Sequence, residues 1–418
     1  MTTTEQVPES EVTPDAAAPF NLALSEEQKE IRDWAHGFAE DVIRPAGEEW
    51  DEREETPWPV IQEAAKIGLY GFEGTAQFFA DPTGLLLPIV NEELFWGDAG
   101  IGMAIFGTTL AVASIFGQGT NEQIGEWIPR CFGSVDDPKV ASFCVSEPDA
   151  GSDVSALRTR AKFDEKTNEW VINGQKAWAT NGGIADVHVV VASVDPELRS
   201  RGQAAFIVPI ETKGISQGVK VKKHGIRASH TAEVLLDEVR IPAENVLGGK
   251  EKLDERLARA REGTKNKSQA AMATFEASRP TVGAQAVGIA RAAYEYALEY
   301  SKEREQFGRP IGSFQGLKHL LADSWIRTEV ARSSVWAAGV TIDEPEVGSI
   351  DRAVAGARLT AARAATENAK TCVQVHGGMG FTWEVDAHLF LKRAWVLETQ
   401  FGSIDDAAEV VAQLYADR

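Results

Sequence analysis

The sequence predicts an α+β protein with an N-terminal helical domain, a central β-domain and a C-terminal four-helix bundle. Apolar residues recur at helical spacing in the first and last thirds of the chain, whereas short β-branched runs separated by turn signals fill the middle. The length of 418 residues also exceeds what a single core usually supports. We expect a disordered tail at 1–20, the helical domain at 21–136, the β-domain at 137–249, a charged insertion at 250–271 and the bundle at 272–418.

The N-terminal helical domain follows a tail whose Thr, Glu, Pro and Ala content predicts disorder. Ser25 and Gln28 have the spacing of a capping box, which predicts the start of a helix. The apolar residues that come next share one helical face and comprise Ile31, Trp34, Phe38 and Val42. We expect this first helix to end at Pro45, because proline lacks the N–H that a helix interior uses.

The β-domain is indicated by short apolar runs that Asn-Gly turns separate, as in hairpins. These runs begin at Val140, Trp170, Val187, Ala205 and Val234. Residues 250–271 are rich in both charges, which predicts an exposed or partly disordered insertion. From Ala273 a long, Ala-rich helical pattern returns, and its apolar stripe through Val282, Ala286 and Ile289 is typical of a bundle.

Composition and charge exclude several classes of protein. The net charge of −21 argues against a nucleic-acid partner, which would need a basic face on the protein. The three cysteines are far apart, which predicts neither a zinc site nor a disulfide framework and fits a reducing compartment. Pro88 and several polar residues interrupt the apolar stretch Gly84–Ala113, so we expect buried helices and no membrane span. The N-terminus has no signal-peptide pattern, and the expected location is cytoplasmic.

Two candidate ligand-binding segments lie in the predicted β-domain. In Phe143–Asp153 a strand ends in a turn where Gly151 would let a ligand approach the backbone, although a solvent loop has the same composition. In Gly174–Gly183 the aromatic Trp178 and the hydroxyl of Thr180 would share one face of a strand. They could cover a flat ring and bond to it, or they could belong to a core beside a hairpin.

Two further segments lie in the predicted bundle. Arg304–Gln315 places a guanidinium, an aromatic ring and an amide around a Gly/Pro turn, which suits a pyrophosphate or an ordinary helix connection. Gln374–Glu384 contains two adjacent glycines that would admit phosphate oxygens to backbone N–H groups, or simply break a helix. Because no strand precedes it, this segment is not a Rossmann fingerprint, and we interpret His376 as structural.

Together and in this order, the four segments resemble motifs of the acyl-CoA dehydrogenase family. The motifs have the forms CV-T/S-EP-x-A-G-S-D, W-x-T-N-G-G, R-x-x-F-G-x-x-x-x-x-x-Q and Q-x-x-G-G-x-G-F. The resemblance runs from about Leu24 to the C-terminus, interrupted by the charged insertion. It implies FAD as cofactor, an acyl-CoA thioester as substrate and α,β-desaturation in lipid metabolism. It also implies a tetramer of identical or related chains, with electron-transfer flavoprotein as electron acceptor.

The resemblance also implies roles for individual residues. The flavin ring and ribityl chain would lie beside Phe143, Val145, Ser146, Gly151 and Ser152. Trp178 and Thr180 would cover the isoalloxazine near its N5 atom. The FAD of a neighbouring subunit would be reached by Arg304, Phe307, Gln315, Gln374, Gly377 and Gly378. Ser403 would also contact the cofactor, and the substrate would contact Ser152, Glu276, Arg279 and Gly402.

The sequence departs from the family at the catalytic base. Family members carry a glutamate at one of two positions, which here hold Phe401 and Ser278, and neither residue can act as a general base. Glu398 lies nearby in sequence and is the remaining candidate, with a structural carboxylate as the alternative. Glu276 would point away from position 278 around the helix and is expected to pair with Arg279. A milder departure is Lys392-Arg393, where Arg-Asp is usual.

Three interpretations of the function follow. The chain is a self-sufficient acyl-CoA dehydrogenase with an unusual base, or an FAD-binding subunit whose partner chain bears the glutamate. The third interpretation is a non-catalytic helical interaction protein that keeps the family shape. The combination of Arg304, Gln315, Trp178 and Thr180 argues against the third, because a protein without flavin has no physical need for all four.

Overall fold

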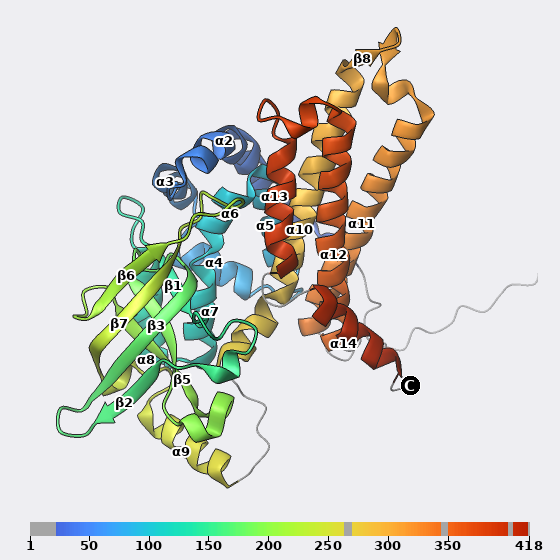
Figure 1. The fold of residues 1–418 in the computed structure, drawn as a ribbon. Helices are drawn as coiled ribbons and strands as arrows, with labels where there is room; N and C mark the ends of the chain where they lie inside the picture. The colour runs from blue at the N-terminus through green and yellow to red at the C-terminus, as the bar shows by residue number, and fades with distance from the viewer. Residues whose placement is uncertain (1–21, 263–269, 344–349, 400–403, 417–418) are drawn as a thin grey trace, which may run out of the picture.

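The structure is a computed structural model that describes residues 22–262, 270–343, 350–399 and 404–416. Its N-terminal part is helical, its middle part is a β-sheet domain, and its C-terminal part is a bundle of long helices (Figure 1). The predicted fold class is therefore confirmed. The expected tail at 1–20 lies outside the described residues.

The N-terminal part consists of short helices. They are α1 (Glu26–Phe38), the π-helical turn η1 (Ala39–Ile43), α2 (Arg44–Arg53), α3 (Trp58–Lys66), α4 (Phe72–Phe79), α5 (Leu86–Gly97), α6 (Ala99–Phe106), α7 (Thr109–Gln118) and α8 (Asn121–Phe132). The capping box is confirmed, because Ser25 Oγ accepts a hydrogen bond from the Gln28 backbone N–H at 3.1 Å. The expected end at Pro45 is wrong. The chain continues from α1 through η1 into α2, and Pro45 lies in the first turn of α2, where a missing N–H removes no helix bond.

The apolar stretch after residue 84 forms the centre of this part. Residues Ala99–Gln118 are long and apolar enough to cross a membrane by composition, but 72 % of this window is buried inside the protein. Gly107 and Thr108 divide it into the separate helices α6 and α7. The stretch thus supplies buried core helices, as the interruptions in its sequence predicted.

The central domain is built on a seven-stranded sheet. Its strands are β1 (Ala141–Cys144), β2 (Arg160–Asp164), β3 (Glu169–Thr180), β4 (Val187–Ser193), β5 (Gln203–Pro209), β6 (Ile215–Lys220) and β7 (Thr231–Pro242). The strand order is β1-β4-β2-β3-β7-β6. The remaining strand, β5, pairs with β4 and is not part of this path. The β1 and β4 strands are parallel, whereas the long β3–β7 and β4–β5 pairs are antiparallel. Trp170, Ile172 and Phe206 lie in the core of this domain.

The expected charged insertion at 250–271 is a helix in its described part, exposed at most positions and buried along one face. Residues Lys250–Arg261 form helix α9, and its Leu253 and Leu257 are buried against the core of the β-domain. Arg256 adds a hydrogen bond from Nη2 to the Gln203 carbonyl at 2.5 Å. The two leucines are four residues apart and so share one helical face, while the charges occupy the other faces. Residues 263–269 lie outside the described part of the chain.

The bundle comprises α10 (Ala270–Glu303), α11 (Gln315–Asp343), α12 (Ile350–His376) and α13 (Ala387–Thr399), followed by α14 (Ile404–Ala416). A short hairpin of β8 (Glu305–Gln306) and β9 (Arg309–Pro310) connects α10 to α11 at one end of the bundle (Figure 1). The buried side chain of Asn368 on α12 ties the helices together. Its amide donates to the Ala290 carbonyl of α10 at 3.1 Å and to the Ser324 carbonyl of α11 at 2.9 Å.

A buried group of charges joins the N-terminal helices to the bundle. Glu93 on α5 accepts a hydrogen bond from Arg291 on α10 at 2.8 Å, and its other oxygen lies 2.8 Å from His36 Nδ1 on α1. The adjacent Glu92 accepts from Arg332 on α11 at 2.7 Å and from Arg291 at 3.0 Å. Both carboxylates are only 4 % exposed. Because buried carboxylates need charged partners, this group fixes how α5 lies against α10 and α11.

Candidate active site

The first two candidate segments are bonded to each other in the β-domain. The Ala177 backbone N–H donates to the Ser146 carbonyl at 2.8 Å, which fastens the turn after β1 to the middle of β3. Glu147 in that turn accepts hydrogen bonds from the backbone N–H groups of Arg158 at 2.6 Å and Thr159 at 3.0 Å. Phe143 and Val145 are buried beneath this turn. The structure therefore holds the turn of Ser146–Ser152 beside the strand that carries Trp178.

An ion pair between these segments escaped the sequence analysis. Lys176 Nζ lies 2.8 Å from Glu147 Oε1 and donates to the Val145 carbonyl at 2.9 Å, and the two side chains are 0 % and 4 % exposed. Burial lowers the pKa of Lys176. Burial by itself would raise the pKa of Glu147, but the Lys176 ammonium and nearby donors hold it below its ordinary value. The sequence offered only a weak signal, because Lys176 is the one charged residue of Gly174–Gly183 but Glu147 is one of three acidic residues in Phe143–Asp153.

Trp178 presents its indole ring to solvent. Its φ of 59° is left-handed, and the pairing of β3 with β7 has an irregularity between Lys176 and Ala179. Such backbone is strained for a bulky residue and is most often kept at functional sites. The indole is 64 % exposed, and Thr180 is half-buried, whereas Ala177 and Ala179 are buried. Exposure thus alternates along this end of β3, and the common ligand-binding face of Trp178 and Thr180 stays a prediction.

The other two segments meet at one end of the bundle. Tyr300 near the end of α10 stacks on His376 at the end of α12, with ring centroids 4.1 Å apart. Arg304, Gln315 and Gln374 are exposed there, and Phe307 is 91 % exposed with a left-handed φ of 54°. In Figure 1 the β8–β9 hairpin lies at the end of the bundle that points away from the β-domain. Within one chain, these residues therefore lie apart from Trp178, which belongs to the β-domain.

His376 is structural, in agreement with its interpretation from the sequence. The ring is buried and stacked between Tyr300 and Tyr296, and its Nδ1 lies 2.8 Å from the Cys372 carbonyl. Burial lowers the pKa of His376. Directly after it, Gly377 takes a φ of 59°, and a Cβ added at Gly377 or Gly378 would meet no other atom within 4 Å. Both glycines thus leave open space for a ligand beside the end of α12.

The two family positions for the base are only partly described. Ser278 lies in α10 together with Glu276 and Arg279, but the orientation of these three side chains is outside the description, and Phe401–Ser403 lie outside the described residues. Glu398 lies at the end of α13 and is half-buried. Its Oε1 accepts a hydrogen bond from Thr366 Oγ1 of α12 at 2.6 Å. That bond turns the carboxylate toward α12 and favours the structural alternative for Glu398.

The departure at Lys392-Arg393 is accommodated by a different set of partners. Arg393 on α13 is 5 % exposed and forms an ion pair with the buried Asp98. Burial raises the pKa of Asp98, which also caps α6 by accepting from the Ile101 backbone N–H at 2.9 Å. The Lys392 ammonium lies over the Trp383 ring, 3.8 Å from its centroid. Arg393 thus connects α13 to the start of α6.

The donor set suits a flat aromatic cofactor that carries a pyrophosphate. An exposed indole and serine hydroxyls lie on the β-domain, and a guanidinium, an amide and open glycines lie at the end of the bundle. Aromatic side chains cover flat rings, while arginine and glycine backbones bind phosphate oxygens. The two groups of residues fit the two halves of FAD.

Comparisons with known proteins agree with this chemistry. Models of the acyl-CoA dehydrogenase N-terminal, middle and C-terminal domains match residues 25–133, 142–239 and 268–415. A probable acyl-CoA dehydrogenase of Mycobacterium leprae, fadE25, is 33 % identical over 390 residues, which cover 91 % of this chain and 93 % of that protein. These matches span almost the whole described chain.

Solved structures show the same likeness. Butyryl-CoA dehydrogenase from Megasphaera elsdenii is 30 % identical with a TM-score of 0.84, covering 95 % of this chain and 100 % of that one. A glutaryl-CoA dehydrogenase from Mycobacterium smegmatis in complex with FADH2 is 26 % identical with a TM-score of 0.79, covering 94 % and 96 %. A chain from a structure of the electron transferring flavoprotein of Acidaminococcus fermentans is 30 % identical with a TM-score of 0.83, covering 95 % and 99 %. The chain therefore belongs to the acyl-CoA dehydrogenase family of FAD-dependent oxidoreductases.

Proposed function

We propose that this enzyme desaturates the α,β bond of an acyl-CoA thioester in lipid metabolism. The main support for this proposal is the exposed ring of Trp178, which lies on strained backbone. The buried Lys176–Glu147 pair holds this part of β3 beside the turn of Ser146–Ser152. When bound, FAD accepts the β-hydride at its N5 atom. The rest of the chemistry falls to the protein, which must orient the thioester, exclude water and remove the α-proton.

The residues of the β-domain bind and orient the flavin in this proposal. Trp178 covers the isoalloxazine and Thr180 bonds near N5, because the two occupy one face at the exposed end of β3. Beside them, the ring and ribityl chain contact Phe143, Val145, Ser146, Gly151 and Ser152. Ser403 completes the flavin contacts, and the thioester and pantetheine contact Ser152, Glu276, Arg279 and Gly402.

The adenosine diphosphate half of FAD would be held at the end of the bundle of a neighbouring subunit. The residues that would hold it there are Arg304, Phe307, Gln315, Gln374, Gly377 and Gly378. Because one chain keeps these residues apart from Trp178, the shared site needs at least two subunits, and we infer the tetramer of identical or related chains that the family resemblance implies. Electron-transfer flavoprotein is the proposed acceptor, which the similarity to the Acidaminococcus chain supports. The proposed location is cytoplasmic.

Two versions of this function differ in which chain supplies the catalytic base. Removal of the α-proton needs an ionised carboxylate at Cα. In this chain Glu398 is the nearest candidate, but its oxygen already accepts the Thr366 hydroxyl. The second version, an FAD-binding subunit whose related partner chain carries the glutamate, is favoured by that hydrogen bond and by Phe401 and Ser278 at the family positions. Both versions share the same flavin site.

Anaerobic titration of the purified holoenzyme with straight-chain acyl-CoAs tests the proposal. We expect acyl-CoA to perturb the flavin absorbance with little bleaching, because a placed carboxylate contributes about 10²–10⁴-fold in rate. Phe401→Glu should bleach the flavin faster by about this factor, whereas the uncharged Phe401→Gln control should not. A flavin that no acyl-CoA perturbs would refute the proposed function.

Rapid bleaching by the unmodified chain would separate the versions. If Glu398→Gln abolishes it, Glu398 is the base and the chain is self-sufficient. If rapid bleaching survives both Glu398→Gln and Glu276→Gln, the base lies elsewhere in the chain. If bleaching appears only after a related partner chain is added, the second version is correct.

A further inference from the structure

The turn that follows Trp178 and Thr180 is attached to two buried histidines. Beyond an irregularity in its pairing with β7, the end of β3 is joined through two residue pairs, the last being Thr180 with Thr231. The chain then turns sharply at Asn181–Gly183, where Asn181 is fully buried with a left-handed φ of 60°. The position of the side chains that are proposed to face the flavin therefore depends on what holds this turn.

Three consecutive residues of the turn are each bonded to a histidine. The carbonyl of His230, directly before β7, accepts from the Asn181 backbone N–H at 3.0 Å. The ring of the same residue places Nε2 3.0 Å from the Gly182 carbonyl. The next residue, Gly183, donates its backbone N–H to Nε2 of His188 on β4, also at 3.0 Å. The start of β4 and the residue before β7 thus hold the turn together.

The two ring hydrogen bonds assign opposite roles to the histidines. A backbone N–H can only donate, so His188 Nε2 is the acceptor. A carbonyl can only accept, so His230 Nε2 carries a proton and donates it. A neutral imidazole has one nitrogen of each kind. Burial lowers the pKa of His188 to about 4 and also lowers the pKa of His230, so both rings are uncharged at neutral pH.

The turn and Thr180 have little free space around them. A Cβ added at Gly183 would overlap Gln217 Cβ on β6, and one added at Gly107, directly after α6, would lie 2.8 Å from Thr180 Cγ2. Protein interiors transmit small displacements because they are close-packed. A binding side chain must be held within about 0.5 Å of its productive position. A loosened turn would therefore misplace the Thr180 hydroxyl and the adjoining indole of Trp178.

We propose that His230 and His188 are positioning residues for the flavin, which orient Trp178 and Thr180 through the turn of Asn181–Gly183. This inference rests on the proposed function, because it takes Trp178 to cover the isoalloxazine and Thr180 to bond near N5. Neither histidine touches the cofactor. Their part is to supply one donor and one acceptor to peptide groups that would otherwise be left unpaired in a largely buried turn.

Two amide variants of His230 separate its hydrogen bond from its bulk. In His230→Gln the side-chain amide extends about as far as Nε2 and can still donate to the Gly182 carbonyl. In His230→Asn the same amide is one methylene shorter and does not reach it. We expect His230→Asn to weaken flavin binding about tenfold, as the loss of one buried hydrogen bond allows, and His230→Gln to retain it. Ultrafiltration of the holoenzyme measures the flavin that is released.

The fluorescence lifetime of the bound flavin is a readout that a merely structural role would not change. An indole stacked on a flavin quenches its fluorescence by electron transfer, so the lifetime reports how Trp178 lies on the ring. The lifetime should lengthen in His230→Asn and stay short in His230→Gln. His36→Leu is the control, because it removes the contact of His36 with Glu93 in the N-terminal helices and leaves the turn intact. It should lower the melting temperature without changing the lifetime.

The possible outcomes are distinct. If His230→Asn lowers the melting temperature but leaves flavin affinity and lifetime unchanged, His230 is only structural and the inference is overturned. Equal loss of flavin from His230→Asn and His230→Gln would also overturn it, because the ring and not its hydrogen bond would then matter. A long lifetime in the unmodified protein would instead refute the flavin site of the proposed function. If His230→Asn does not fold, His188→Gln and His188→Asn repeat the comparison at the acceptor that Gly183 uses.

Discussion

At the scale of single residues, the Lys176–Glu147 pair shows how a binding segment is kept in place. The ammonium and the carboxylate are both buried and lie 2.8 Å apart, so each would be a costly isolated charge without the other. The carboxylate also accepts two backbone N–H groups beyond the turn. Its position therefore determines the shape of the turn of Ser146–Ser152, which we propose contacts the flavin.

Lys176→Met tests this role. Removal of one partner leaves the Glu147 carboxylate buried without compensation, and we expect the free energy of unfolding to fall by about 3–5 kcal/mol. Urea denaturation measures that change, and the flavin retained after gel filtration should fall with it. The double variant Lys176→Met with Glu147→Gln is the control, since it removes both charges and should be destabilised less than the single variant. Equal losses in the two proteins would contradict the argument.

At the scale of helices, His36 and Glu93 join α1 to α5, and Arg291 joins α5 to α10. The hydrogen bond to Glu93 raises the pKa of His36 above its ordinary 6.5. Burial opposes ionisation of Glu93, but Arg291 and His36 outweigh it and lower its pKa from 4.5 to about 2. The two pKa shifts therefore affect the stability of the fold on opposite sides of neutral pH.

The dependence of stability on pH follows from these directions. The His36 contribution is complete below pH 6.5 and is lost as the pH rises through its raised folded-state pKa. The Glu93 contribution is complete above pH 4.5 and is lost as the pH falls toward about 2. Melting temperatures from about pH 5 to about pH 9 should decline at the alkaline end. In His36→Gln that alkaline decline should be smaller, and an unchanged decline would mean that another group causes it.

At the scale of the whole molecule, the proposed cofactor site is divided between two distant parts of each chain. Trp178 lies on the β-domain, whereas Arg304 lies on the hairpin at the end of the bundle that points away from it (Figure 1). A dinucleotide that contacts both must bridge two subunits. Binding of FAD and assembly are then coupled, because each stabilises the same interface.

Arg304→Ala should release flavin and shift the protein toward smaller oligomers, with both effects seen together. The guanidinium is proposed to hold the pyrophosphate by charge-assisted hydrogen bonds, which alanine cannot replace. Light scattering measures the oligomer, and absorbance of the same sample measures its flavin content. Arg309→Ala is the matched control in the same hairpin, because Arg309 stacks on Phe314 of its own chain at 4.1 Å. A monomer that retains its full flavin would exclude a shared site.

Local features of this protein were predictable from its sequence because they depend on neighbours in the chain. The capping box of Ser25 and Gln28 needs contacts only three residues apart, and the change from helical spacing to short β-branched runs and back predicted the fold class. The candidate flavin segments were found as motifs, and their individual roles remain proposals. Helix α9 was missed because Leu253 and Leu257 are outnumbered by charges, although their spacing marks a buried face.

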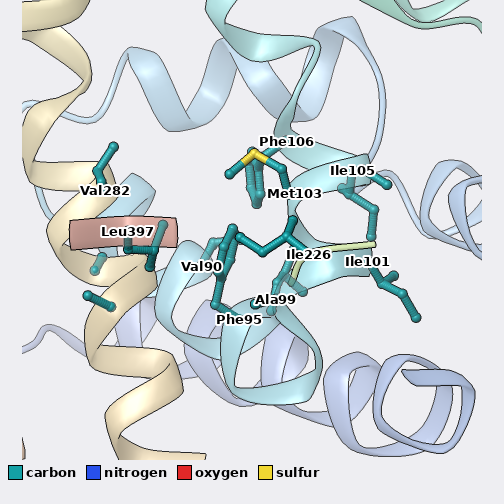
Figure 2. Close-up of a cluster of buried hydrophobic side chains, with 14 of the residues drawn as sticks. Val90, Phe95, Ala99, Ile101, Met103, Ile105, Phe106, Ile226, Val282 and Leu397 are labelled. Carbon is teal, nitrogen blue, oxygen red and sulfur yellow. The ribbon is translucent and has the colours of Figure 1, made fainter. Parts of the chain in front are cut away.

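Contacts between distant residues were decided only by the tertiary structure. The motifs contained Glu147 and Lys176 without showing that they pair, because that pairing depends on how β1 and β3 are brought together. Likewise, the sequence did not indicate that His36 meets Glu93, that Arg393 meets Asp98, or that Ile226 joins the buried cluster that contains Phe95 (Figure 2). Hydrophobic periodicity indicates that one face of an element is buried, but it does not indicate which other element covers that face. The covering element is selected by packing over the whole chain, and that packing determines which charges become partners.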